Sequence, residues 1–264
     1  MRIGIIVQAR LSSSRLPGKV LYELGGQPVL GLICQRLKRS RQSQEIIVAT
    51  GDGHLNYPIM EVAKRYGVLG FAGPEEDVLQ RYALAAQHYG LDGIVRVTAD
   101  CPLVDPELID EMIAVFLSKS CDYVTNVKPP SWPDGLDISI FTRALLERAN
   151  QKAEMFSERQ HVVTWMWKAV FNATEKEFRG VNFVAPEDLS RHRWVIDEPR
   201  DYSFFQELVK YFGPDKLCGA GWRDVISVLQ FHPDLCKLNG GIIRDEGLAR
   251  DLLKDGVWGK IQNH

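Results

Sequence analysis

The chain has 264 residues, of which 45% are hydrophobic and 25% are charged, and its formal net charge is −2. This composition fits a globular protein with one large domain and excludes a dedicated, strongly basic nucleic-acid-binding protein. There is no apolar run of the roughly 20 residues that a membrane span needs, and the N-terminus lacks the apolar region of a signal peptide. The five cysteines are scattered, with no C-x-x-C pair, so we expect neither a zinc site nor disulfides, and a cytoplasmic location.

Short apolar segments alternate with amphipathic segments over the first half of the chain. The strand-like segments are Ile3–Gln8, Ile46–Thr50, Val68–Phe71, Ile94–Thr98 and Tyr123–Asn126. The helix-like segments are Pro28–Lys38, Pro58–Tyr66, Asp77–Tyr89 and a helix that Asp105 caps and Pro106 begins. This alternation predicts an α/β fold: a Rossmann-like, mainly parallel sheet with helices on both faces.

The pattern changes from about residue 128, where the proline-rich segment 129–135 predicts a loop. The later elements that we expect are a strand at Asp137–Phe141, helices over Thr142–Gln151 and Ser157–Phe171, a strand at Arg193–Ile196, and a helix over Pro199–Phe212. We assign residues 1–230 to one domain with an insertion at 128–171. Residues 231–264 form a C-terminal extension with a short helix near Leu248–Lys254.

The most informative segment is residues 9–19, Ala-Arg-Leu-Ser-Ser-Ser-Arg-Leu-Pro-Gly-Lys, which directly follow the first strand. Backbone N–H groups and serine hydroxyls can bind phosphate oxygens, and Arg15 and Lys19 can neutralise their charge. The spacing of the common P-loop, G-x-x-x-x-G-K-[ST], is absent. The segment predicts a triphosphate site; the simpler interpretation is a basic turn after a strand.

Two acidic residues, Asp100 and Asp197, each follow a predicted apolar strand. Ligands of open parallel sheets bind at the carboxyl ends of the strands, so both carboxylates are expected near the loop 9–19. Carboxylate oxygens on rigid strand ends suit Mg²⁺. The alternatives are that Asp100 is a turn residue and that Asp197 caps the helix that begins near Pro199.

These segments resemble the sugar cytidylyltransferases, which include the synthetases of CMP-Kdo and CMP-sialic acids. The opening pattern A-R-x-x-S-x-R-L-P-G-K is present in full at residues 9–19. A closer similarity is to the subgroup of spore coat polysaccharide biosynthesis protein F. The segments that carry it are 77–82 (Asp-Val-Leu-Gln-Arg-Tyr), 96–103 (Arg-x-Thr-x-Asp-Cys-Pro-Leu), 133–137, 157–162 and 195–199.

The resemblance implies a fold of the nucleotide-diphospho-sugar transferase type and a role for each matching residue. Arg15 and Lys19 would hold the triphosphate of CTP and, with Asp100, carry the catalysis. Asp100 and Asp197 would hold Mg²⁺. The remaining nucleotide-binding residues that it implies are Ala9, Arg10, Ser13 and Arg96, with the loop around Ala9 facing the cytosine. Family members commonly form dimers, so we expect a homodimer with an interface within residues 133–171.

The acceptor side of the site rests on weaker patterns. Asp134 and Asp137 flank a glycine in a loop that could bind sugar hydroxyls; an ordinary Asp-Gly turn explains them equally well. Glu158 and His161 are three residues apart on a predicted helix and share a face, so they could bind the acceptor or form a solvated pair. The segment 191–194, Arg-His-Arg-Trp, is more basic and aromatic than the family pattern, which predicts an unusual acceptor pocket.

The function that we expect is transfer of CMP from CTP to a sugar-like acceptor with release of pyrophosphate, in surface or spore-coat polysaccharide biosynthesis. Alternatives are a nucleotidyltransferase that uses another NTP, a glycosyltransferase that consumes a nucleotide sugar, and a non-enzymatic nucleotide-binding protein. Glycosyltransferases of related fold carry an Asp-x-Asp motif after a strand, and here Asp100-Cys101-Pro102 stands in that place.

Overall fold

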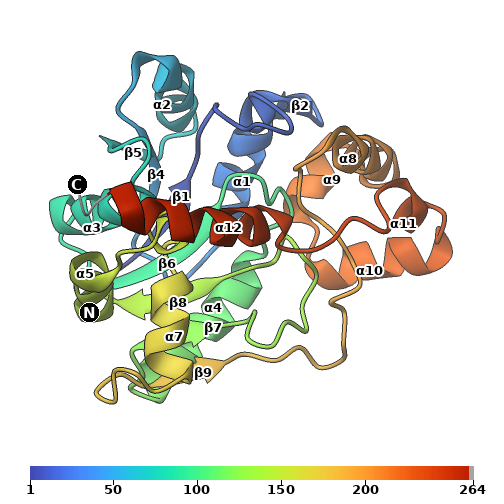
Figure 1. Cartoon of the computed structure of the whole chain (residues 1–264). Coiled ribbons are helices and arrows are strands. Elements are labelled where there is room, and N and C mark those ends of the chain that lie inside the picture. Colours follow the sequence, from blue (N-terminus) through green and yellow to red (C-terminus); the bar gives the residue numbers. More distant parts are fainter. Residues whose placement is uncertain (262–264) are drawn as a thin grey trace.

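The computed structural model describes residues 1–261, apart from the side chains of residues 214, 215 and 257–261. Its centre is a seven-stranded sheet (Figure 1). In spatial order the strands are β5 (Leu69–Gly73), β4 (Glu45–Gly51), β1 (Ile3–Gln8), β6 (Gly93–Thr98), β8 (Ser139–Thr142), β7 (Tyr123–Thr125) and β9 (Gly180–Asn182). The first four are parallel, and β8 runs antiparallel to both β6 and β7. The mainly parallel sheet is therefore confirmed.

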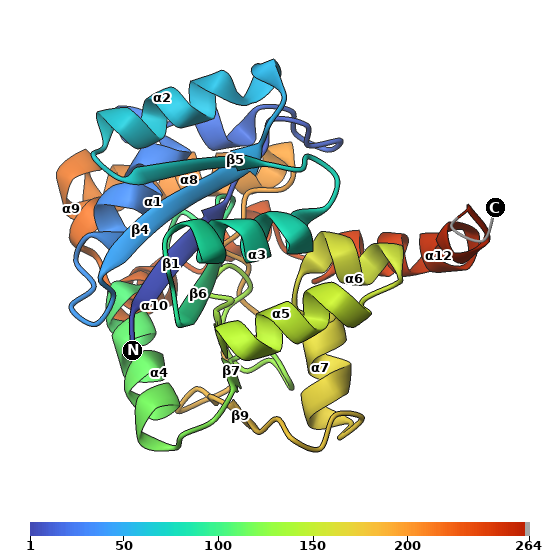
Figure 2. The ribbon, with the colours of Figure 1, turned by 90° about the vertical axis from the view of Figure 1, so that its left-hand side faces the viewer.

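Helices cover both faces of the sheet, as the sequence predicts (Figure 2). The first face packs on α1 (Val29–Leu37), α2 (Tyr57–Arg65), α4 (Pro106–Ser118), α8 (Pro199–Phe212) and α10 (Trp222–Phe231). The second face packs on α3 (Val78–His88), α5 (Arg143–Lys152) and α7 (Thr164–Phe171). Apolar residues face both ways along β1, since Ile5 joins the first core and Ile6 the second. Burial on both faces explains the continuous apolar runs of the central strands.

The shorter elements lie around the sheet and near its carboxyl edge. They are η1 (Lys19–Leu21), the hairpin of β2 (Glu23–Leu24) and β3 (Gln27–Pro28), η2 (His54–Asn56), α6 (Phe156–His161), α9 (Pro214–Gly219), α11 (Leu235–Leu238) and α12 (Glu246–Ile261). In Figure 1, α12 (red) crosses in front of the sheet. It packs beside α6, as Figure 2 shows. None of the helices that residues 1–261 form combines the length and apolar character needed to cross a membrane.

Local sequence signals account for most element boundaries. Asp105 caps α4 as predicted, because its carboxylate accepts hydrogen bonds from the N–H groups of Glu107 and Leu108. One predicted helix, Ser157–Phe171, is wrong: the chain forms α6 and α7, with Val162 between them at a φ of 59°. A positive φ is strained for a β-branched residue and cannot continue a helix.

The predicted insertion at residues 128–171 contributes directly to the core. Its strand β8 lies between β6 and β7, and Ile140 and Phe141 are fully buried there. The predicted strand at Arg193–Ile196 is also wrong. That segment is extended but makes only an isolated bridge, between Arg193 and Asp134, and it belongs to no strand of the sheet.

Candidate active site

A cavity of about 1090 Å³ opens at the carboxyl ends of β1 and β6. Segments far apart in the chain form its walls. They are the loop 9–15, Thr98–Cys101 after β6, the acids Asp134 and Asp137, the residues Arg193, Val195 and Asp197, and residues of the segment 243–254. The location is where ligands bind in open α/β sheets. The segment 243–254, in the C-terminal extension, forms a wall that sequence reasoning did not predict.

The loop after β1 is held in one conformation by its own backbone and by a neighbouring loop. The N–H of Gly18 donates to the carbonyl of Leu11 (3.0 Å), and the N–H of Leu11 donates to Oδ1 of Asn56 (3.3 Å). Gly18 adopts a φ of 70°, which glycine tolerates without strain, and Lys19 then begins η1. Ala9, Arg10 and Ser13, three predicted nucleotide-binding residues, line the cavity.

Lys19 joins the two predicted metal-binding acids. Its Nζ lies 2.8 Å from Oδ2 of Asp100 and 2.5 Å from Oδ1 of Asp197. Burial disfavours the ammonium ion, but attraction to both carboxylates outweighs burial and holds the pKa of Lys19 above its usual value. Burial likewise disfavours ionised Asp100, and Lys19 nevertheless lowers the pKa of that carboxyl. The loop residue Lys19 and the acids Asp100 and Asp197 therefore form one charged cluster.

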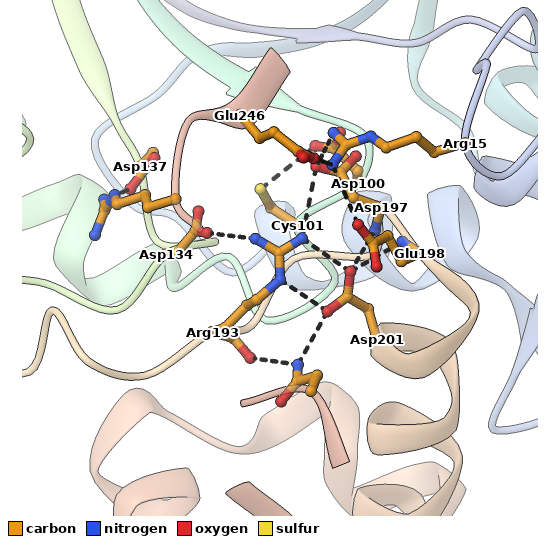
Figure 3. Close-up of polar contacts among 12 residues, drawn as sticks. Arg15, Asp100, Cys101, Asp134, Asp137, Arg193, Asp197, Glu198, Asp201 and Glu246 are labelled. Atoms are coloured by element: carbon orange, nitrogen blue, oxygen red, sulfur yellow. Dashed lines mark hydrogen bonds and ion pairs between the residues drawn. The ribbon is translucent and has the colours of Figure 1, made fainter. Parts of the chain in front are cut away.

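Arg15 extends the cluster toward the C-terminal extension (Figure 3). One Nη atom lies 2.6 Å from Oδ2 of Asp197, and the other lies 3.1 Å from Oε2 of Glu246, in the first turn of α12. Both predicted phosphate-binding cations thus have carboxylate partners within the chain. Among the ion-pair partners of Arg15, which include Asp197, Glu198 and Glu246, the carboxylate of Glu246 is the most exposed and therefore the easiest for a phosphate group to displace.

Asp197 reaches the cluster without a preceding strand. The extended chain before it lies beside Asp100, because the N–H of Ile196 donates to the carbonyl of Asp100 (2.8 Å). Asp197 is not the cap of α8 either. Glu198 occupies the N-cap, and Asp201 accepts hydrogen bonds from the N–H groups of Asp197 and Glu198. The side chain of Asp197 is therefore left for Lys19 and Arg15.

Sequence reasoning missed a buried network below Asp197. The guanidinium of Arg193 donates to both carboxylate oxygens of Asp201 (2.8 and 2.9 Å) and to Oδ2 of Asp134 (2.9 Å). Asp201 is fully buried and also accepts from the side-chain amide of Asn239 (3.1 Å). The only sequence signal was the basic character of residues 191–194.

Asp134 and Asp137, the predicted acceptor-binding acids, both line the cavity. Burial raises the pKa of Asp134 to about 6 and that of Asp137 to about 7, although Arg244 attracts both carboxylates and hydrogen-bonds Asp137. Between them, Gly135 has a φ of 107°, and a Cβ there would clash with the carbonyl oxygen of Trp194. The turn is therefore specific for glycine and packs the acids against the Arg193 segment.

Of the three remaining predicted site residues, Arg96 and His161 line the cavity and Glu158 does not. Arg96 lines the cavity, where its Nε donates to Oε1 of Gln8 (3.1 Å). His161 also lines it, and its Nε2 lies 3.0 Å from Oδ2 of Asp251 in α12. The structure does not bring Glu158 to this site.

Glu158 is instead part of the helix start. Its carboxylate accepts from the N–H groups of Glu154 and Met155 (3.2 Å each) and from Nζ of Lys168 (2.7 Å). The shared helix face that the spacing predicted therefore does not place both side chains in the cavity, because Glu158 turns back to the first turn of its own helix.

The donor set of Asp100 and Asp197 suits a hard cation. Two carboxylates converge on one positively charged atom, Nζ of Lys19, and Mg²⁺ commonly takes one or two carboxylates with phosphate oxygens and water. Among the side chains that the structure describes, no group of three or more His, Cys, Asp or Glu residues forms a complete metal site. The geometry thus fits a cation that shares its coordination with a ligand, not a closed structural site.

Comparison with known proteins gives a consistent result. The sequence model of the family described as "Cytidylyltransferase" matches residues 4–178. An uncharacterised protein of Methanocaldococcus jannaschii is 34% identical over 92% of this chain and 96% of its own. Spore coat polysaccharide biosynthesis protein SpsF of Bacillus subtilis is 29% identical over 88% of this chain and 95% of its own.

A solved structure agrees with the sequence comparisons. The structure of a cytidylyltransferase from Leptospira borgpetersenii superposes with a TM-score of 0.84 at 32% identity, covering 92% of this chain and 99% of that one. The likeness thus extends beyond the matched residues 4–178 into the C-terminal part of the fold. The chain belongs to the cytidylyltransferase family and is a nucleotidyltransferase.

Proposed function

We propose that the protein transfers CMP from CTP to a hydroxyl group of a sugar or sugar-like acceptor and releases pyrophosphate. The observation that carries the proposal is the convergence of Arg15 and Lys19, on the loop after β1, with Asp100 and Asp197. Cations that can bind a triphosphate and carboxylates that can hold its metal ion meet at one end of a cavity large enough for a nucleotide.

Nucleotide binding would rearrange the charge pairs of Arg15 and Lys19. The triphosphate takes up the positive charge of Arg15 and Lys19, and the Glu246 carboxylate gives way to phosphate oxygens. Asp100 and Asp197 would hold Mg²⁺, which supplies charge neutralisation at the α-phosphate when it is bound. Ala9, Arg10, Ser13 and Arg96 bind the rest of the nucleotide along the same wall.

In the reaction, the oxygen of the acceptor hydroxyl forms a bond to the α-phosphorus and loses its proton to solvent, and the bond from that phosphorus to the bridging oxygen of pyrophosphate breaks. Lys19 and Arg15 stabilise the charge that develops on the leaving pyrophosphate. Asp134, Asp137 and His161 line the acceptor side and accept hydrogen bonds from its hydroxyl groups. Positioning and charge stabilisation carry most of the catalysis in such transfers.

The proposal also includes a biological role and an oligomeric state. The likeness to a spore coat polysaccharide biosynthesis protein supports a role in the synthesis of surface or spore-coat polysaccharide. A homodimer, expected from the family resemblance, is part of the same proposal, and light scattering of the purified chain measures it.

The test is a pyrophosphate-release screen. The chain is incubated with Mg²⁺ and CTP, UTP, ATP or GTP, each against acidic sugars, amino sugars and sugar phosphates. We expect release that requires both CTP and one acceptor class. Equal release with all four nucleotides contradicts the CTP assignment. If no nucleotide stabilises the chain in a thermal-shift assay and no pyrophosphate forms, the whole proposal is wrong.

A further inference from the structure

Arg193 lines the cavity, and its guanidinium lies among the carboxylates of Asp134, Asp197 and Asp201 (Figure 3). Its side chain is only 8% exposed, and three carboxylates surround its single positive charge. Two of them, on Asp134 and Asp201, lie within hydrogen-bonding distance, and the third, on Asp197, lies 3.8 Å away. A purely structural ion pair needs one acid, whereas Arg193 hydrogen-bonds two, Asp201 and Asp134, which belong to different segments of the chain.

The contact with Asp201 controls the backbone of Asp197. Arg193 binds both oxygens of Asp201 through Nε and Nη2, a two-point contact that fixes the plane of the carboxylate. Oδ2 of Asp201 in turn accepts from the N–H of Asp197 (3.0 Å). The orientation of the Asp197 main chain, and with it the direction of its side chain, therefore depends on Arg193.

The contact with Asp134 reaches the opposite side of the cavity. Backbone hydrogen bonds already join the two segments, from the N–H of Asp134 to the carbonyl of His192 (2.9 Å) and from the N–H of Trp194 to the carbonyl of Asp134 (2.6 Å). In addition, the hydrogen bond from Nη1 of Arg193 to Oδ2 of Asp134 fixes the orientation of that carboxylate. One guanidinium thus connects the acid beside Lys19 with the acid on the acceptor side.

We propose that Arg193 is a positioning residue that sets the direction of Asp197 for metal-bound nucleotide and links it to Asp134 on the acceptor side. The inference rests on the proposed function, since it concerns how Asp197 receives Mg²⁺ with CTP. Residues that orient metal ligands typically change metal affinity by about 10–100-fold when they are replaced. Arg193 touches neither reacting group in this proposal and acts through the two aspartates.

The experiment measures the Kd of CTP by calorimetry, in EDTA and in excess Mg²⁺, and compares the gain in affinity that Mg²⁺ brings. Arg193→Lys keeps the charge but loses the two-point contact. We expect CTP binding in EDTA to stay near the wild-type value, because Arg15 and Lys19 are intact. The gain from Mg²⁺ is expected to fall about 10-fold.

Arg159→Lys is the matched control. Arg159 is also a largely buried arginine that binds an aspartate, Asp77, through two nitrogens, and it does not line the cavity. If Arg193 has a structural role alone, both variants lower the melting temperature and both keep the wild-type gain from Mg²⁺. That result overturns the inference.

A second variant covers failure of Arg193→Lys to fold. Asp134→Ala leaves the buried pair of Arg193 and Asp201 in place and removes the side-chain link across the cavity, and because the CTP titration contains no acceptor, the acceptor role of Asp134 does not affect its result. We expect a smaller loss of the Mg²⁺ gain, about twofold, in a chain that melts cooperatively. An unchanged gain in this variant contradicts the proposed link.

The wild-type chain separates failure of this inference from failure of the proposed function. A wild-type chain that does not bind CTP overturns the proposed function and this inference with it. A wild-type chain that binds CTP equally well with and without Mg²⁺ removes the metal from the proposal and overturns the role of Arg193. If Mg²⁺ raises the CTP affinity of the wild-type chain and of Arg193→Lys equally, only the role of Arg193 is overturned and the proposed function stands.

Discussion

The ammonium group of Lys19 lies 2.5 Å from the carboxylate of Asp197, although 178 positions separate the two residues in the chain. Lys19 also lies 2.8 Å from Asp100, so one buried cation holds together the end of the loop after β1, the segment after β6 and the start of α8. The predictions below begin from this contact.

Replacement of Lys19 by alanine is expected to lower acceptor-dependent pyrophosphate release from CTP by about 10²–10³-fold, by analogy with the loss of one donor to a developing negative charge. The change also leaves Asp100 and Asp197 facing each other without their shared counter-ion, so the melting temperature falls as well. Lys64→Ala, at an exposed position on α2 outside the cavity, is the control. Wild-type turnover in Lys19→Ala contradicts the assignment.

Replacement of Glu246 by glutamine is expected to tighten CTP binding several-fold. The carboxylate of Glu246 lies 3.1 Å from Arg15 and would compete with phosphate for that cation. Removal of one competing charge-assisted bond at a half-exposed position is worth about 0.5–1 kcal/mol, or roughly two- to fivefold in Kd.

Glu207→Gln provides the comparison for Glu246, because Glu207 pairs with Lys210 on α8, outside the cavity. Calorimetric titration with CTP measures both variants. Weaker binding in Glu246→Gln would mean that Glu246 supports the nucleotide site and does not compete for it.

The stability of the fold is expected to depend on pH through Asp137. Burial raises the pKa of this carboxyl to about 7 in the folded chain, above the value of about 4 for an unfolded one. The folded state therefore binds more protons between these values. The stabilisation is complete below about pH 4 and is lost as the pH rises through about 7.

Urea unfolding at several pH values measures this dependence. Asp137→Asn cannot ionise and serves as the reference. Relative to that variant, the wild-type chain is expected to lose about 2–3 kcal/mol of unfolding free energy between about pH 5 and pH 8. A difference that stays constant with pH shows that Asp137 does not titrate in this range.

Replacement of Glu158 by glutamine is expected to destabilise the fold without affecting nucleotide binding. Its buried carboxylate binds two backbone N–H groups through one oxygen and Lys168 through the other. The amide oxygen of glutamine can still accept from the N–H groups, but its NH2 group would face the ammonium group of Lys168, and loss of that charge-assisted bond costs about 1–2 kcal/mol. Thermal melting and CTP titration together test this expectation. An unchanged melting temperature with weaker CTP or acceptor binding would return Glu158 to the binding site.

The local elements follow from the sequence because their causes are local. Apolar runs such as Ile3–Gln8 form strands wherever a sheet buries both faces, and Asp105 followed by Pro106 marks the start of a helix by hydrogen bonding within a few residues. The exceptions have a tertiary origin. The chain breaks at Val162 between α6 and α7, and residues 193–196 stay outside the sheet although their composition resembles that of a strand.

The candidate site is partly a local and partly a long-range property. The residues of the loop 9–19 that can bind phosphate lie close together in the sequence, so Arg15 and Lys19 are recognisable as candidate phosphate-binding residues without a structure. Glu246 and Arg244 carry no local pattern that points to the site. They reach it because α12 runs beside α6 and its first turn lies over the cavity, a contact between segments that the sequence does not relate.

By itself, then, the sequence determined the alternating α/β pattern, the family and the identity of the charged loop, because hydrophobic periodicity and short motifs act over a few residues. It also predicted that Asp100 and Asp197 lie near that loop, and the tertiary structure decided how they are held there. Asp197, Arg193 and Asp201 form a buried network only when the extended segment before α8 lies against Asp100 and Asp134. Arg193, Asp197 and Asp201 lie within nine residues of one another, but Asp100 and Asp134 are far from them in the chain, and only the folded backbone brings the two groups together.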